Sequence, residues 1–279
     1  MANTGVADVS ATIQKVVSAV TTRTLIQESV ALAVPGVWDR SNEVGPGMDR
    51  LDMIELASLS VQTVDETGAA MTPQTINPSA ALLVLDQNKS VPFALTHRGQ
   101  LQSKIALVSK TIENGARSLA ADLDDYVFAQ AVAAAATTIT VAGADGLEDV
   151  RAAKKVFDDA NVPRFSRAIV GSSEWINNKL LATNTVIRAN EYGSNAPIRT
   201  GFVAELLGFM IFESNSSSIP NDGFLALGAE AVAFARQRSV SLESQVQVLS
   251  QKTDYALTHL FGAEATAASN PRIMVYDPV

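Results

Sequence analysis

One helical pattern about thirty residues long constrains the fold of this chain more than any other feature. From Ser103 onward, residues recur on one face at spacings of three and four. These positions are Ile105, Val108, Ile112, Ala116, Leu119, Leu123, Val127 and Gln130. At 1.5 Å per residue, a helix over this stretch is about 45 Å long, well above the three-turn mean of globular proteins. The pattern therefore predicts a single, very long amphipathic helix.

A second unusual feature precedes that helix, between residues 51 and 95. Two β-like stretches, MIELASLSVQTV and ALLVLDQNKSVPFAL, flank about sixteen residues rich in Gly, Pro, Asn and Thr. The arrangement predicts a long β-hairpin. Because an isolated two-stranded hairpin is marginally stable in water, this one needs a surface to lie on. Two surfaces remain open at this point: its own domain, or another copy of the chain.

The remaining patterns mix helices and strands. Residues 9–34 read as an N-terminal helix interrupted by TTRT (21–24) and ended by Pro35 and Gly36, so the first 50 residues form an extension. LEDVRAAKKVFDDANVP predicts a helix that stops at Asn161 and Pro163. RAIVG predicts a short buried strand, and SSEWINNKLLAT a helix with Ser172 or Ser173 as its N-cap.

The C-terminal third reads mainly as strands. The stretch GFVAELLGFMIFESN (201–215) places two glycines around a short apolar turn and then alternates, which indicates architecture rather than chemistry. After a loop over 214–223 we expect a strand at FLALG and a short apolar helix at AEAVAFARQ. VSLESQVQVLSQ predicts a long strand with Val240, Leu242, Val246 and Val248 on one face, and two strand segments follow it. The expected fold class is α+β.

Charge and composition exclude several classes of protein. The net charge of -8, from 29 acidic and 21 basic residues without blocks, argues against a domain that grips nucleic acid, although not against a surface that merely encloses it. The absence of cysteine excludes disulfides and sulfur-ligated metals and suits a reducing cytoplasm. The start lacks the pattern of a signal peptide. The uncharged stretch 126–144 is too rich in Ala, Thr and Gly for a membrane span.

Few residues invite a chemical interpretation, and each has a structural alternative. Ser172 and Ser173 lie on a strand-to-helix turn faintly like a nucleophile elbow, but Trp175 stands where the second glycine of G-x-S-x-G would be, and a helix cap is the better interpretation. His97 and His259 have no partner at i+3 or i+4, so we expect structural roles. We expect neither a catalytic nor a cofactor-binding residue, and no enzyme activity.

Charged groups on two predicted helices complete the candidates. Asp122, Asp124 and Asp125 could hold a divalent cation, but a solvated helix face is the commoner outcome. A small basic face could bind phosphate or simply be solvated, and we favour the second; its members are Arg151, Lys154 and Lys155. We therefore expect no metal site and no cofactor.

The order of these parts resembles a known family. An N-terminal arm, a long hairpin, a long helix and a compact α/β region with a returning long strand resemble the major capsid proteins of tailed bacteriophages, the Hong Kong 97-like fold. LAADLDDYVFAQAV resembles the end of that family's spine helix, and VRAAKKVFDDANVPRFSRAIVGSSEWINNKLL its helix, turn, strand and helix. GFVAELLGFMIFESN is similar to the family signature G-x-v-x-x-x-x-G-f-x-v-x-x-S-N. The resemblance is strongest from residue 102 to 279.

The resemblance implies a division of the chain. It gives an N-terminal arm (1–45), an extended loop (46–100), a peripheral domain with the spine helix (101–145 and 238–261) and an axial domain (146–237 and 262–279). It leaves no room for a large inserted domain or a long scaffolding segment ahead of the arm. Some relatives join subunits by an isopeptide bond from a lysine on the extended loop to an asparagine; residues 53–87 contain no lysine, and Lys89 is expected near the hairpin base.

The resemblance also implies a function. We expect a capsid protein that assembles as pentamers and hexamers into an icosahedral shell around double-stranded DNA, located in the virion and assembled in the host bacterial cytoplasm. Scaffolding, portal and decoration proteins are possible partners, and no membrane is involved. An encapsulin-type compartment holding cargo protein is the alternative with the same fold, and a soluble serine hydrolase is the remote one.

Overall fold

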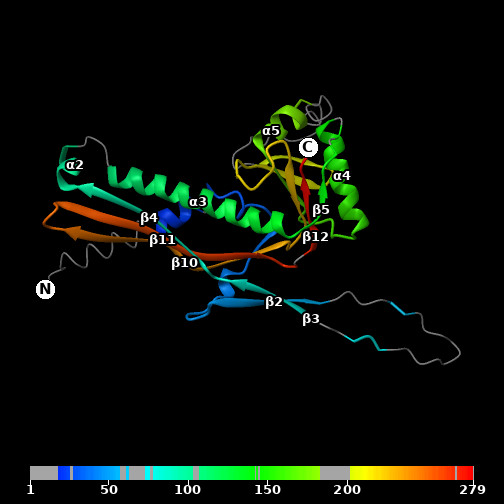
Figure 1. Ribbon diagram of the computed structural model, residues 1–279, viewed down its shortest axis with the longest axis horizontal. Coiled ribbons are helices and arrows are strands. Elements are labelled where there is room, and N and C mark those ends of the chain that lie inside the picture. Colours follow the sequence, from blue (N-terminus) through cyan, green and yellow to red (C-terminus); the bar gives the residue numbers. More distant parts are fainter. Residues whose placement is uncertain are drawn as a thin grey trace, which may run out of the picture.

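The computed structural model describes residues 18–25, 28–56, 61–62, 73–75, 78–102, 107–141, 143, 145–182, 202–267 and 269–278. These residues form an elongated molecule in which one long helix runs between two sheets and a β-hairpin projects from the body (Figure 1). The α+β class is therefore confirmed. None of the described helices is long and apolar enough to cross a membrane.

The long helix is α3 (Leu107–Ala133, 27 residues), about 40 Å at the usual rise per residue. Its buried face carries Ile112, Leu119, Leu123 and Val127, at the spacing that the sequence predicts. Gly115 lets the helix approach the neighbouring sheet closely, since a Cβ at this position would lie 2.6 Å from the Leu257 side chain. A short helix, α2 (His97–Gln102), precedes it.

A four-stranded sheet lies under the first part of α3. Its order is β1-β10-β11-β4, with β1 parallel to β10 and the other pairs antiparallel. The strands are β1 (Val37–Asp39), β10 (Val232–Gln247), β11 (Lys252–Ala265) and β4 (Gln87–Thr96). The sequence pattern placed β4 in the second arm of the long hairpin, but this strand pairs with β11 instead. Pairing with a buried strand gives it the partner that a lone hairpin lacks.

The segment AEAVAFARQ corrects another prediction. It forms no helix: from Val232 onward it is the first part of β10. Its side chains alternate between two packed surfaces, because Val232 and Phe234 face the main core while Ala233 and Ala235 face the hairpin. Burial on both sides overrides the helical preference of its alanines. The four residues predicted to share one face differ: Val240 and Leu242 of β10 are buried, whereas Val246 near its end and Val248 in the following turn are exposed.

The second sheet has six strands in the order β5-β12-β9-β6-β8-β7. The strands are β5 (Ala135–Ile139), β12 (Asn270–Tyr276), β9 (Phe224–Leu227), β6 (Ala168–Gly171), β8 (Phe209–Glu213) and β7 (Phe202–Leu206). The predicted strands RAIVG and FLALG are central, and all four residues of both β6 and β9 are buried. Within the stretch that the pattern left as a turn and an alternating run, residues 202–213 form the β7–β8 hairpin. Its two turn residues, Leu207 and Gly208, both have positive φ (53° and 86°), as a tight two-residue turn requires.

Helices cover the outer face of this sheet (Figure 1). Helix α4 (Gly146–Asp159) begins at an Asp145 cap, whose side chain accepts from the Glu148 amide at 2.9 Å, and ends before Asn161, which has a φ of 53°. Helix α5 (Ser173–Trp175) continues into one π-helical turn, η2 (Ile176–Leu180). The predicted end of the first of these helices before Asn161 and the predicted helix at SSEWINNKLLAT are therefore confirmed.

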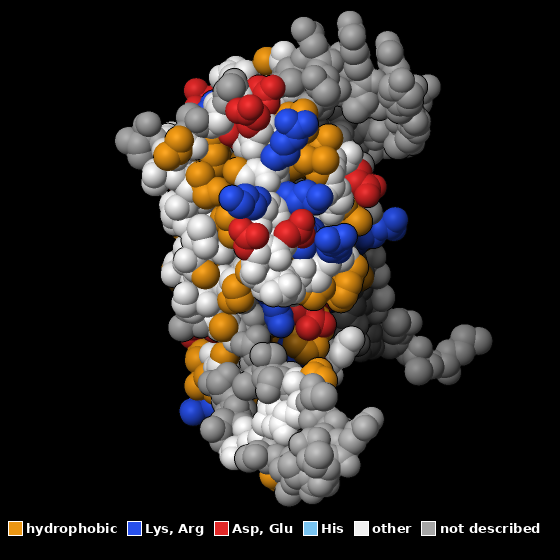
Figure 2. Space-filling model, turned by 90° about the vertical axis from the view of Figure 1, so that its right-hand side faces the viewer, with side chains coloured by type: hydrophobic (Ala, Val, Ile, Leu, Met, Phe, Trp, Pro, Cys, Tyr) orange, Lys and Arg blue, Asp and Glu red, His pale blue; other side chains and the backbone are white. Residues whose placement is uncertain are grey.

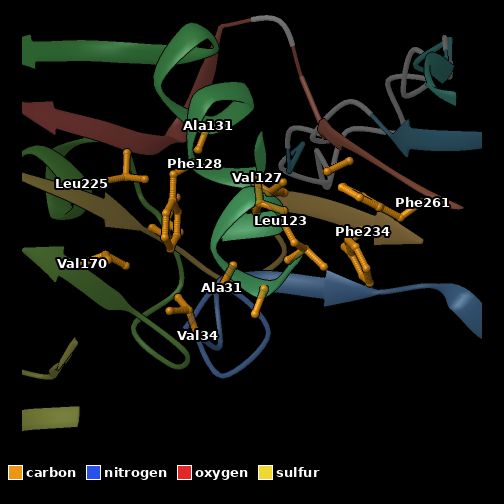
Figure 3. Packing of buried hydrophobic residues seen from close by; sticks show 14 of the residues in the cluster. Ala31, Val34, Leu123, Val127, Phe128, Ala131, Val170, Leu225, Phe234 and Phe261 are labelled. Atoms are coloured by element: carbon orange, nitrogen blue, oxygen red, sulfur yellow. The ribbon is translucent and has the colours of Figure 1, made fainter. Parts of the chain in front are cut away.

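One hydrophobic core joins both sheets through α3 (Figure 3). Phe128 and Ala131 from its second half pack with Val170 and Leu225 of the six-stranded sheet, and Leu123 lies toward Phe234 and Phe261 of the four-stranded sheet. The opposite face of the six-stranded sheet has a separate core with α4 and α5, centred on Phe157 and Trp175. A third, smaller cluster lies at the hairpin base.

The N-terminal helix departs from the prediction at TTRT. Residues 18–25 are helical without interruption at residues 21–24. Thr22 Oγ1 donates to the Ser18 carbonyl oxygen at 2.9 Å and Thr24 Oγ1 to that of Val20 at 3.1 Å. These bonds to the carbonyl four residues earlier let threonine remain in a helix. The part of the predicted helix before Ser18 lies outside the described residues.

Candidate assembly surfaces

The β-hairpin of β2 (Arg50–Leu56) and β3 (Pro78–Val84) is the part of the described chain that extends furthest from the core (Figure 1). The two strands pair antiparallel over seven residues each, so a hairpin is present, but it is shorter than the one predicted over 51–95 because most of the second predicted arm is β4. Of the expected tip, residues 65–80, the structure describes only 73–75 and 78–80, and the last three of these belong to β3.

One face of the hairpin base belongs to the protein's own core. Leu51, Met53, Leu83 and Leu85 pack with the small side chains on the outer side of β10, Ala233 and Ala235. The backbone approaches closely at the hairpin root: a Cβ on Gly262 of β11 would lie 2.1 Å from the Val84 carbonyl oxygen. A side chain at position 262 would therefore displace the hairpin.

The opposite face of the same hairpin is exposed and mixes apolar with charged side chains, because Leu82 and Val84 lie opposite Asp52 and Arg50. Ile54, Leu82 and Val84 have exposed fractions of 69%, 41% and 44%. A two-stranded hairpin is only marginally stable when its faces are left in water. Large apolar side chains that are exposed on a projecting element therefore indicate a candidate contact surface. Sequence reasoning missed this division, because MIELA and ALLV are almost entirely apolar and do not show which side chains face inward. The inner face therefore lies on the protein's own domain, which is the first of the two surfaces left open by the sequence.

A second exposed apolar group lies at the turn between β10 and β11. Val246, Val248 and Leu249 are all exposed there. This turn is at the end of the molecule distant from α4 (Figure 1). The elongated body therefore carries apolar side chains both on its projecting hairpin and at one end.

The two histidines lie in the four-stranded sheet region and do not meet. His97, at the start of α2, has its Nε2 3.3 Å from Thr253 Oγ1. His259, on β11, is 1% exposed and stacks on Phe261 with ring centroids 4.9 Å apart. Burial, and secondarily the charge of Arg236, lowers the pKa of His259 to about 4. Both are placed as packing residues.

The three aspartates of α3 correct the expectation of a solvated face. Asp122 is half-exposed and pairs with Lys89 Nζ at 3.4 Å. Asp124 is only 7% exposed and accepts from the Val30 and Ala31 amides, while Asp125 accepts from the Ser217 amide. Burial raises the pKa of Asp124, against its hydrogen bonds. Among the described residues, no group of acidic or histidine side chains is arranged to hold a metal ion. The sequence missed these partners because they lie more than ninety residues away.

Ser172 caps a helix, as favoured from the sequence. Its Oγ accepts from the Trp175 amide at 3.1 Å and donates to the Asn221 carbonyl oxygen. Ser173 Oγ lies 3.2 Å from Asn177 Nδ2 on the same helix. Both hydroxyls are thus engaged in local structure.

The small basic face of α4 is mixed with acidic groups. Arg151 and Lys155 are exposed, and Lys154 Nζ lies 3.9 Å from Asp158, one turn along the helix. Figure 2 shows Lys and Arg side chains interleaved with Asp and Glu on this side of the molecule. Such a mixture is typical of a solvated surface.

Comparison with known proteins decides the fold. No family model matches the chain, and no curated protein does. Solved structures do. A Mycobacterium phage Che8 chain matches with a TM-score of 0.63, 24% identity and 82% and 84% of the two chains covered. A Microbacterium phage Oxtober96 chain matches with a TM-score of 0.67 and 16% identity, and the match covers 90% of this chain and 91% of that chain. The capsid structure of cyanophage P-SCSP1u matches with a TM-score of 0.65 and 15% identity, and the match covers 87% and 86% of the two chains.

The chain has the Hong Kong 97-like fold. The matches cover 82% and 90% of this chain and 84% and 91% of the matched chains, so the likeness extends well beyond one common motif. In the terms of this fold, α3 is the spine helix and the β2–β3 hairpin is the extended loop. Identities of 24% and below leave the function to be argued from the surfaces.

Proposed function

We propose that this chain is the major capsid protein of a tailed bacteriophage, which assembles as pentamers and hexamers into an icosahedral shell around double-stranded DNA. The observation that carries the proposal is the projecting hairpin, one face of which is built into the subunit while the other presents Ile54, Leu82 and Val84 to solvent. A second copy of the chain is the natural cover for this face, because closed symmetric assemblies place the same patch against the same site in every copy.

The fold supports the proposal, since the matched structures include capsids of other phages. The predicted division into arm (1–45), extended loop (46–100), peripheral domain (101–145, 238–261) and axial domain (146–237, 262–279) remains part of it. The proposal also includes assembly in the host cytoplasm and interaction with scaffolding, portal and decoration proteins. The net charge of -8 suits a wall that encloses DNA without gripping it.

The test is assembly of the full-length chain expressed alone and together with its neighbouring phage genes. We expect particles of uniform diameter by electron microscopy and DNA inside those made during infection. A monomer in size-exclusion chromatography under all of these conditions would overturn the proposal. Particles that contain a single cargo enzyme and no DNA would replace it with the encapsulin alternative, and serine-directed probe labelling of a monomer with the hydrolase.

A further inference from the structure

Two adjacent carboxylates on α3 hold two different parts of the chain. Asp124 Oδ1 accepts from the Ser29 hydroxyl and, at 3.0 Å, from the Ala31 amide, while its Oδ2 accepts from the Val30 amide at 2.9 Å. Asp125 holds the loop that follows β8. Its Oδ1 accepts from Ser216 Oγ and, at 2.9 Å, from the Ser217 amide.

The segment bound by Asp124, residues 28–34, is the root of the N-terminal arm. Ala31 and Val34 are buried beside Leu123 and Phe128 of α3 (Figure 3). The arm root contains no strand and only a short turn, so side-chain contacts rather than a ladder of backbone bonds fix its place. Asp124 supplies the acceptors for two of its amides, which would otherwise be buried without partners.

The residues just before the root follow the free edge of β10. The Leu242 amide donates to Ser18 Oγ at 3.1 Å, and Thr22 Oγ1 lies 3.4 Å from the Val240 carbonyl oxygen. A change in the direction of the arm root would carry residues 18–25 away from these positions. Within the described residues, the arm thus has an anchored root at 28–34 and a segment, 18–25, that lies along the sheet edge.

We propose that Asp124 is the positioning residue of the N-terminal arm: its two oxygens fix the arm root against α3 and thereby set the direction from which the preceding residues reach a neighbouring copy. This inference rests on the proposed function, because the neighbour is another subunit of the shell. Asp125 has a different task, since it ties the same point of α3 to the loop 214–218.

The chemistry of the two carboxylates differs in a way that a single isosteric change reveals. Asp124 accepts through both oxygens, so asparagine would turn an NH2 group toward an amide or hydroxyl donor and lose at least one bond. The Asp125 side chain accepts both of its hydrogen bonds through Oδ1, from Ser216 Oγ and from the Ser217 amide. Asparagine can therefore keep both bonds with its one side-chain oxygen. Asp122, two residues before Asp124, makes only a half-exposed ion pair with Lys89 and is a matched control.

The experiment compares the full chain with Asp124→Asn, Asp125→Asn and Asp122→Asn. Hydrogen exchange is measured on unassembled subunits, and particle yield and diameter are measured by electron microscopy. We expect exchange in residues 28–34 to accelerate about tenfold or more in Asp124→Asn, as loss of one charge-assisted bond permits, with few or malformed particles. Asp125→Asn and Asp122→Asn should resemble the wild type in both measurements.

Unchanged exchange of the arm root in Asp124→Asn overturns the proposal, as does a loosened root with particles of normal yield and diameter. Absence of particles from the wild type and Asp122→Asn would instead count against the proposed function, and the exchange data would still decide the anchoring. If Asp124→Asn does not fold, Ser29→Ala removes one donor alone and should loosen the root to a smaller extent.

Discussion

Single buried polar groups decide how this subunit responds to its surroundings, and His259 is the clearest case. Its ring lies in the core under α3, and within the described residues its Nδ1 has no hydrogen-bond partner. Protonation would place a charge there without compensation, close enough to Arg236 to be repelled by it. The folded subunit therefore keeps this histidine neutral at acidities where the unfolded chain binds a proton.

This burial predicts a loss of stability in mild acid. The pKa of His259 falls from 6.5 in the unfolded chain to about 4 in the fold. The stability that the neutral, buried ring allows is therefore fully present above pH 6.5 and is lost as the pH falls toward 4. Between pH 7.5 and 5 the free energy of unfolding should drop by about 2 kcal/mol through this group. Urea unfolding of the subunit measures it, and His259→Gln should flatten the pH dependence over that interval. An equally steep dependence in the variant would contradict the assignment.

Asp124 shows what sequence reasoning could not reach at this scale. Three acidic residues on one helix read as a solvated face, yet one of them is buried by a segment 94 residues earlier. Ser172 was predictable because its partner, the Trp175 amide, is three residues away. Local bonds can be read from the chain, whereas long-range bonds appear only once the fold brings the segments together.

At the scale of elements, the β2–β3 hairpin is divided between two environments. Its inner face joins a cluster with β10, and its outer face is exposed. Changes on the two faces should therefore have different consequences: the inner face stabilises the subunit, and the outer face serves assembly.

Ile54→Asp tests the outer face. The side chain is 69% exposed, so the charge should change the melting temperature of the subunit little, while burial of that charge between copies should abolish particles. Circular dichroism and electron microscopy measure the two effects. Ile54→Val, which keeps an apolar branched side chain, is the control and should assemble. Normal particles from Ile54→Asp would show that the outer face stays in solvent.

Elements with strong local patterns were predictable, and those decided by burial on both sides were not. The period of α3 and the presence of a hairpin are visible in the chain and are confirmed, whereas the predicted length of the hairpin is wrong. The start of β10 was wrong because alanine-rich AEAVAFARQ favours a helix locally, while two packed surfaces demand a strand. The place of β4 in the four-stranded sheet depends on its pairing with β11, which lies far along the chain and could not be inferred from the local pattern.

For the whole molecule, the contacts between copies should be non-covalent. Residues 53–87 contain no lysine, and Lys89 lies on β4 with its amine directed to Asp122 of its own α3. That amine is thus engaged inside the subunit, away from the hairpin. Boiling particles in detergent should release a single band near 29.4 kDa on a denaturing gel. A ladder of covalent oligomers would contradict this and point to Lys89.

The core that α3 shares with both sheets has a mechanical consequence. Protein interiors are close-packed and barely compressible, so a force applied to one sheet passes through Leu123 and Phe128 to the other with little deformation. In the proposed shell, a wall one subunit thick that is pressed outward by tightly packed DNA would then consist of stiff subunits joined by more deformable contacts. Strain should then concentrate at the contacts between subunits. Rupture is expected there, and a reinforcing protein would be most effective at the same contacts.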